Sequence, residues 1–294
     1  MATAKQRRAY VSRINRAFRQ QDRLTDDTIR SILSMLVELR KDIAPIVLEA
    51  GDFQAANLQR IIAQIETAVN AFESHLTDTT LTAIRNAYEL GENAVTEPLI
   101  AAGVQLPLLT LGSQRIAILE AFGADLVKDV SDEIKRRIAA QVRLAAIGAG
   151  QPLNIMREIT GILGVINQRK MIVKGVAARA EKIYRTELNR VFSMGNYDKQ
   201  VSLSQSIPGL QKQWMATGDL RTRKSHLDAH GQIVPVNELF RVGGEDMMFP
   251  HDPGASAKNV VQCRCRSVTV HPDIGPMITA EDARIDKERA RRER

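Results

Sequence analysis

The sequence has no long apolar run, only two cysteines and few aromatic residues. None of its apolar runs reaches the roughly 20 residues that a transmembrane helix needs, and no apolar segment of the signal-peptide kind follows its basic N-terminus. Cys263 and Cys265 stand so close in sequence that a disulfide between them would be strained. We therefore expect free thiols or metal ligands, in a protein that works in a cytosol or in a particle assembled there.

The positive charge is concentrated at the N-terminus. The net charge of the chain is +7, and residues 1–23 hold seven basic residues against one acidic residue. On a helical wheel, Val11, Ile14 and Phe18 lie opposite several of the arginines. Such a basic amphipathic helix can offer arginines to phosphate groups, lie on a membrane, or present a solvated face. The candidates for DNA contact are Arg7, Arg8, Arg13, Arg16, Arg19 and Arg23.

Before about residue 200 the sequence predicts helices. Apolar residues recur there at intervals of three and four, and nothing shows the alternation of a strand. These apolar stripes are interpreted as packing faces between helices. Pro45 is expected to end or kink the first helix. The expected helices cover about 29–39, 58–72, 79–96, 112–147 and 154–200.

Beyond residue 200 the composition changes. Six of the ten prolines, the only tryptophan, both cysteines and four of the five histidines lie there. Residues 231–236 and 260–270 alternate like short strands, and in the second of them the two cysteines fall on one face. Thr279 and Asp282 form a capping-box-like pair at the start of a mixed-charge helix.

The predicted fold class is mainly α, with a long-helix N-terminal region followed by a small α+β module of short antiparallel strands. The sequence divides into four segments: a basic N-terminal arm at 1–24, a helical region at 25–175, the α+β module at 176–270 and a charged C-terminal tail at 271–294.

An ordered series of short motifs carries the functional signal. The series consists of Tyr184-Arg-Thr-Glu187 with Asn189, then Trp214-Met-Ala-Thr217-Gly-Asp219-Leu-Arg221-Thr-Arg223, His226, Gly231-Gln232 and finally Cys263-Arg-Cys265-Arg. In its order and approximate spacing over residues 176–270, this series resembles the Mu-F-like domain of phage head morphogenesis and minor head proteins. The helical N-terminal half carries no matching motif.

The resemblance implies a structural protein of the phage virion that is not an enzyme. It implies association with the portal, in the capsid interior or at the portal vertex, after assembly in the host cytoplasm. The protein would then assist head assembly, DNA packaging or ejection. Its expected partners are the portal protein, capsid or scaffold proteins and packaged DNA, and no membrane.

Four polar residues of the motif series are expected to form a structural network. Carboxylates paired with guanidinium groups can lock the long helix to the strand module. The rival interpretation is an active site with Glu187 as acid or base, but the sequence shows no nucleophile or phosphate-binding loop in a suitable context. The network candidates are Arg185, Glu187, Asp219 and Arg221.

A metal site is the second expectation. Two imidazoles and two thiolates make a closed tetrahedral site of the kind that structural zinc uses, and the candidates are His226, His230, Cys263 and Cys265. The alternative is a pair of buried thiols packed as small apolar groups. Relative to the resembled family, Arg223 replaces a cysteine of a Cys-x-x-Cys motif, and Val260-Val261 stands where a histidine is usual. His230 or His251 would have to take that histidine's place.

Two other functions stay open. One is a zinc-stabilised nucleic-acid-binding protein that acts alone. The other is the leading module of a phage-type toxin, because Mu-F-like modules also resemble the first parts of multidomain toxins. About 24 residues follow Val270, which is short for an effector domain, so the structural head protein is preferred.

Overall fold

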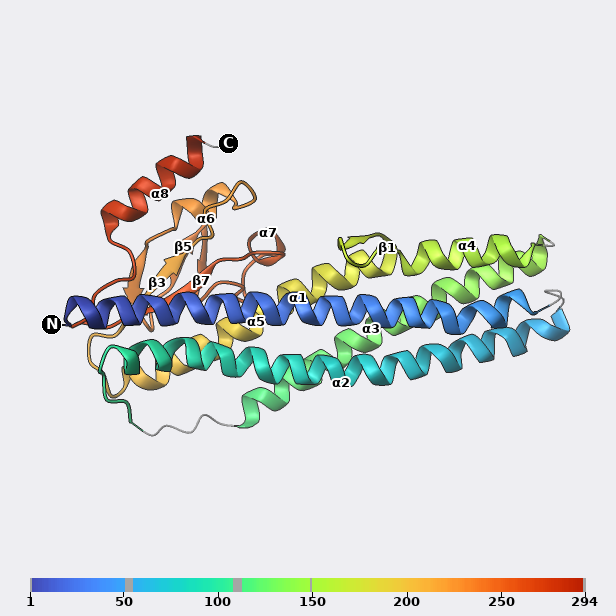
Figure 1. Cartoon of the computed structure of the whole chain (residues 1–294), viewed down its shortest axis with the longest axis horizontal. Helices are drawn as coiled ribbons and strands as arrows, with labels where there is room; N and C mark the ends of the chain where they lie inside the picture. Colours follow the sequence, from blue (N-terminus) through green and yellow to red (C-terminus); the bar gives the residue numbers. More distant parts are fainter. Residues whose placement is uncertain (1, 51–54, 108–112, 149, 293–294) are drawn as a thin grey trace. The chain divides into compact units, whose positions relative to one another are not determined.

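The computed structural model describes residues 2–50, 55–107, 113–148 and 150–292, with the elements in the order labelled in Figure 1. Long helices occupy the chain up to residue 204, and most of the strands follow as short antiparallel pairs. The predicted fold class is confirmed. Within the described ranges, no helix is long and apolar enough to cross a membrane.

The helices of the first half are longer than their periodic segments predict. The apolar stripes at 58–72 and 79–96 belong to one helix, and the first helix continues past Pro45. The long helices are α1 (Ala4–Leu48), α2 (Ala55–Ala101), α3 (Ser113–Ile147) and α5 (Gly175–Ser204). The shorter ones are α4 (Pro152–Leu163), α6 (Lys224–Asp228), α7 (Ala257–Val260) and α8 (Ala280–Arg292). The predicted capping box at the start of α8 is confirmed by reciprocal hydrogen bonds between Thr279 and Asp282.

The prediction of one helix over 154–200 is wrong in its middle. Helix α4 ends at Leu163, and Gly164 takes a left-handed backbone with φ of 78°. A small antiparallel hairpin of β1 (Val165–Asn167) and β2 (Ile172–Val173) then leads into α5. Glycine adopts this conformation without a steric penalty and is common where helices end. Gly164 was therefore a sequence signal for the end of α4, but the apolar periodicity continues past it.

The strands beyond residue 204 form one sheet and one hairpin. In the three-stranded antiparallel sheet, β3 lies between β4 and β7. The hairpin pairs β5 with β6. These strands are β3 (Gln211–Met215), β4 (Ile233–Pro235), β5 (Phe240–Val242), β6 (Glu245–Met247) and β7 (Arg266–Val270).

The predicted strand over 260–270 is correct only in its second half. Residues 261–265 form a turn between α7 and β7, in which Gln262 takes a left-handed φ of 54°. The two cysteines therefore do not share the face of a strand, because the left-handed residue breaks the alternation on which that prediction depended.

The chain forms two compact units, each assembled from distant segments. Unit 1 consists of Met1–Thr25, Arg85–Ile116 and Arg185–Arg294, and unit 2 of Asp26–Ile84 and Ala117–Tyr184. Unit 2 has one continuous apolar core of helical residues. Unit 1 has a core that joins helices to the sheet and another around Trp214. The four-part linear division of the sequence stays a prediction.

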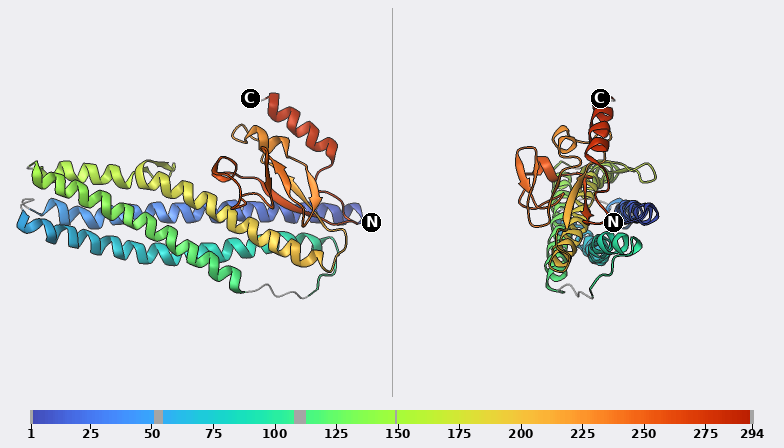
Figure 2. Two further views of the ribbon diagram at one scale, coloured as in Figure 1. Left: turned by 180° about the vertical axis from the view of Figure 1, so that it is seen from behind. Right: turned by 90° about the vertical axis from the view of Figure 1, so that its left-hand side faces the viewer.

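Within unit 1, the first part of α1 packs against the sheet. Figures 1 and 2 show it beside β3 and β7. The Tyr10 side chain is buried and its hydroxyl donates to the Thr269 carbonyl of β7. Arg266 of β7 is buried as well, and its guanidinium lies 2.9 Å from the Asp22 carboxylate. The basic N-terminal segment is therefore part of the folded core of unit 1.

Two glycines let α2 and α5 approach closely within unit 1. A Cβ atom on Gly91 of α2 would lie 2.1 Å from the Phe192 carbonyl oxygen of α5. A Cβ on Gly195 of α5 would lie 2.3 Å from the Tyr88 carbonyl oxygen of α2. Backbone atoms cannot move aside as a flexible side chain can, so the crossing requires glycine on both helices.

Replacing Gly195 by alanine is expected to destabilise the protein by more than about 2 kcal/mol, because the methyl group forces the two helices apart. Chemical denaturation followed by circular dichroism measures this change. Gly161→Ala in α4 is the control, because a Cβ there meets no atom within 4 Å; it should be neutral or stabilising by up to about 1 kcal/mol. Equal stability of the two variants would contradict the close crossing.

Candidate metal centre

Three potential metal ligands meet inside unit 1. His226 comes from α6, and Cys263 and Cys265 come from the turn before β7. All three side chains are buried, and their ligand atoms lie within 4.8 Å of one another. The Nδ1 atom of His226 is 3.4 Å from each of the two Sγ atoms. We call these three residues the His-Cys-Cys cluster.

The turn that carries the cysteines is fixed by hydrogen bonds at both ends. The Gln262 N–H donates to the Thr186 hydroxyl of α5 at 3.0 Å, and the Cys263 N–H donates to the Val260 carbonyl at 3.1 Å. The Cys265 N–H points at the Cys263 sulfur at 3.3 Å. Backbone donors of this kind stabilise a thiolate, so the turn is suited to present sulfur ligands.

A side-chain amide selects the tautomer of His226. The Asn259 Nδ2 atom donates to the Val242 carbonyl at 3.4 Å, which turns its Oδ1 atom toward the imidazole. That oxygen is 3.4 Å from the His226 Nε2 atom and can only accept. A neutral His226 with its proton on Nε2 can donate to this oxygen, and the lone pair of its Nδ1 atom then faces the two sulfurs. Metal-binding histidines are commonly oriented by such a partner on the other ring nitrogen.

The two thiols differ in acidity. The hydrogen bond between them lowers the pKa of Cys263 well below its usual range, and burial opposes this shift. The same hydrogen bond raises the pKa of Cys265, and burial adds to that shift. Cys263 is thus the first to lose its proton, and it supplies the anionic sulfur that a metal cation needs.

The donor set fits a thiophilic metal. Two sulfurs and one imidazole are ligands that zinc takes in proteins, and buried ligands are typical of structural sites. Among the described residues, the metal-ligand group consists of these three side chains. The structure thus contains a His-Cys-Cys cluster that is compatible with a structural metal ion.

The other two histidines considered as ligands have different surroundings. His230 does not join the described cluster, because its Nδ1 accepts the Ala216 N–H at 3.0 Å and its Nε2 lies 3.4 Å from Asp286. His251 is buried with a left-handed φ of 71°, and its Nε2 donates to the Cys263 carbonyl at 2.7 Å. His251 therefore supports the cysteine turn through the backbone.

Asp219 and Glu187 each pair with an arginine outside the four predicted network residues. Asp219 accepts two hydrogen bonds from the Arg264 guanidinium, at 2.5 and 2.6 Å, which hold the pKa of its carboxyl well below its usual range. Asp219 also accepts the backbone N–H of Arg221, whose side chain is exposed. Arg264 stands between the two cysteines, so this ion pair fixes the segment before α6 to the metal-ligand turn.

The other half of that network lies on α5. Glu187 pairs with Arg190 at 2.6 Å, one helical turn along, and burial raises the pKa of its carboxyl. Arg185 is half-buried on the same helix. The spacing of three residues between Glu187 and Arg190 was a sequence signal for the pair. The four candidates are therefore distributed between α5 and the segment before α6.

The candidate DNA contacts all lie on α1 and are of two kinds. Arg7 donates to the carbonyls of Ile274 and Pro276, both at 3.0 Å, and Arg13 lies 3.6 Å from the Glu97 carboxylate. The remaining four are exposed, and these are Arg8, Arg16, Arg19 and Arg23.

Comparison with known proteins confirms the family. Residues 128–268 match the family described as phage Mu protein F like protein, which supports the family predicted from the motif series. The matched range contains the whole His-Cys-Cys cluster. This match supports a phage head-related protein.

Two curated relatives match shorter segments. A segment of 104 residues is 29% identical to the NAD(+)–arginine ADP-ribosyltransferase EFV of Enterococcus faecalis (strain ATCC 700802 / V583), and covers 35% of this chain and 21% of that protein. A segment of 89 residues is 30% identical to the uncharacterized protein YqbB of Bacillus subtilis (strain 168), and covers 29% of each. The chain thus aligns with less than a third of either relative. No solved structure matches.

Replacing Asn259 by alanine is expected to change the tautomer of His226 in the metal-free protein. The wild type should carry the proton on Nε2, whereas the variant should populate both tautomers because the acceptor is gone. Long-range ¹⁵N–¹H NMR of the imidazoles distinguishes them. Asn259→Asp retains an acceptor and should keep the wild-type tautomer, and His230 serves as an internal reference. A wild-type His226 protonated on Nδ1 would show that Asn259 does not determine the tautomer.

Proposed function

We propose that this member of the phage Mu protein F-like family is a structural, non-catalytic minor component of the phage head. It associates with the portal and assists head assembly, DNA packaging or ejection. The observation that carries the proposal is the family match over residues 128–268, which includes the sheet strands β3 and β4 and the first part of β7. Its place is the virion, in the capsid interior or at the portal vertex, after assembly in the host cytoplasm.

Exposed apolar side chains in unit 2 support a protein partner. Leu144 and Ile147 at the end of α3 are 59% and 85% exposed, and Leu153 at the start of α4 is 64% exposed. Large apolar side chains gathered on one part of a surface are typical of contact sites between proteins. The portal protein is the proposed partner for this surface, and capsid or scaffold proteins are further candidates.

The metal ion of the His-Cys-Cys cluster is proposed to be structural zinc. Bound there, zinc would cross-link α6 to the turn before β7. The buried ligands and the tautomer of His226 support this assignment. The protein's own residues position the donors, and the proposal involves no chemical reaction at the metal.

One bound zinc per chain is expected, and removing it with a chelator should lower the unfolding temperature by about 5 °C or more. Cys263→Ser, Cys265→Ser and His226→Ala should each weaken zinc binding by more than about 100-fold. His230→Ala is the matched control and should keep the metal. Elemental analysis, competition with a zinc-binding dye and calorimetry provide the measurements. Loss of zinc from the His230 variant would assign the site to other residues.

Mass spectrometry of purified phage particles should detect the protein together with the portal. The double variant Ile147→Asp and Leu153→Asp should reduce its incorporation at least about tenfold, because it introduces charge into the proposed contact. Ile166→Asp with Ile172→Asp is the control, because both side chains are exposed in the β1–β2 hairpin, elsewhere in unit 2. Absence of the wild-type protein from the particles would contradict the head role.

A second candidate function follows from the Enterococcus faecalis relative, whose name states an NAD(+)–arginine ADP-ribosyltransferase activity. This chain would then be a module of a transferase of that type, which is how the toxin alternative would apply to it. Transfer of ADP-ribose from labelled NAD(+) to arginine by the purified protein would favour this candidate over the structural one. A zinc-stabilised nucleic-acid-binding protein that acts alone would bind DNA and zinc but would be missing from the particles.

A further inference from the structure

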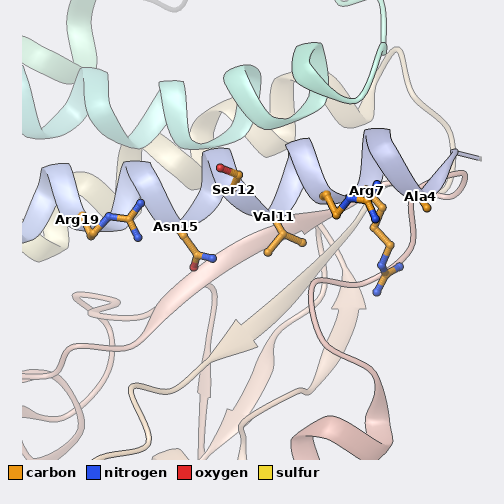
Figure 3. Close-up of a pocket in the computed structure, with 7 residues that line it drawn as sticks. Ala4, Arg7, Val11, Ser12, Asn15 and Arg19 are labelled. Carbon is orange, nitrogen blue, oxygen red and sulfur yellow. The ribbon is translucent and has the colours of Figure 1, made fainter.

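A groove runs along the exposed side of the first part of α1, in unit 1. It encloses about 670 Å³, and its lining includes Arg7, Arg8, Ser12, Asn15 and Arg19. In Figure 3, Arg7 and Arg19 lie toward the two ends of the row, with Ser12 and Asn15 between them. The groove thus combines the apolar side chains of Ala4 and Val11 with a row of hydrogen-bond donors, and positive charge lies toward both of its ends.

The polar residues of the groove follow the repeat of the helix. Arg8, Ser12, Asn15 and Arg19 are spaced by four, three and four positions, so they form one stripe along α1. At 1.5 Å per residue, the stripe from Arg8 to Arg19 is about 16 Å long. A single small anion cannot bridge that length. A ligand with several anionic groups in a row can contact both arginines at once.

The arginines of α1 differ in what already binds them. Arg7 is held by the carbonyls of Ile274 and Pro276, and Arg13 lies beside Glu97. Among the described residues, no carboxylate pairs with Arg8 or Arg19, and both side chains are exposed. Their charge is available to a ligand from solution, whereas Arg7 fixes the wall of the groove.

The opposite side of this part of α1 is already occupied. Tyr10, Ile14 and Ala17 are buried in unit 1, and the Tyr10 hydroxyl bonds to β7. A helix that binds a membrane surface needs a free apolar face. In the groove, the apolar side chains are the small Ala4 and Val11, so an anionic polymer is favoured over a lipid bilayer as the ligand. Tyr10 is also unable to stack on a base.

We propose that this groove binds the phosphate backbone of double-stranded DNA without reading its sequence. DNA carries one phosphate per about 3.4 Å of axis on each strand, so the stripe spans several phosphates. Arg8 and Arg19 contact phosphates at its ends, and Ser12 and Asn15 donate hydrogen bonds between them. This inference does not depend on the portal association or on zinc.

The test compares two double variants of the full-length protein. Arg8→Gln with Arg19→Gln should weaken binding to a random-sequence duplex at least tenfold in fluorescence anisotropy at low salt. The slope of log K against log salt should fall by about 2, one for each lost phosphate contact. Arg16→Gln with Arg23→Gln removes the same charge from exposed positions of α1 outside the groove lining, and should weaken binding less than threefold.

Each other outcome overturns the proposal. Equal loss in both double variants would mean general attraction to a basic helix, without a specific groove. No binding of the wild-type protein to the duplex at low salt would exclude DNA as the ligand. Binding to vesicles of anionic lipid, lost in the Arg8 and Arg19 variant while DNA binding stays, would assign the groove to a membrane. Circular dichroism of both variants checks that they remain folded.

Discussion

The arrangement of unit 1 depends most on the contacts of the buried Arg266 guanidinium. It lies 2.9 Å from the Asp22 carboxylate of α1, 5.4 Å from the ring centre of Phe192 in α5, and donates to the Cys265 carbonyl at 3.3 Å. Burial lowers the pKa of this arginine, and the Asp22 charge opposes that shift. A buried charge keeps its free energy low only while its partners stay in place. The arginine therefore requires α1, α5 and β7 to keep one arrangement.

That requirement links the two candidate sites of unit 1. Arg266 directly follows Cys265, so the residue that anchors the first part of α1 also fixes the end of the metal-ligand turn. On the other side of Cys263, the ion pair of Arg264 with Asp219 ties the same turn to the segment before α6. The Cys-Arg-Cys-Arg motif thus combines two kinds of residue. Its two cysteines belong to the His-Cys-Cys cluster. Its two arginines form ion pairs with Asp219 and Asp22, which attach neighbouring segments to the turn.

These features agree with the structural role proposed for the protein. The His-Cys-Cys cluster is buried, its histidine is oriented by Asn259, and its cysteine turn is fixed by Thr186 and His251. Such restraint favours a structural metal, because little reorganisation is needed when the ion binds. The exposed positive charge of α1 lies on a helix whose other side is packed in the core. It can contact a polyanion without disturbing the fold.

The sequence by itself determined the mainly α fold class, the family resemblance, the capping box of α8 and the three residues that meet in the His-Cys-Cys cluster. Each of these depends on local spacing or on an ordered motif, which a sequence displays directly. Only the tertiary structure decided the rest. The left-handed backbone at Gly164 and Gln262 broke the predicted helix and strand, because apolar periodicity contains no information on φ. The structure placed His230 beside Asp286, and paired Asp219 with Arg264 and Arg266 with Asp22. These contacts join residues that are distant in sequence, and their geometry is set by how whole elements pack.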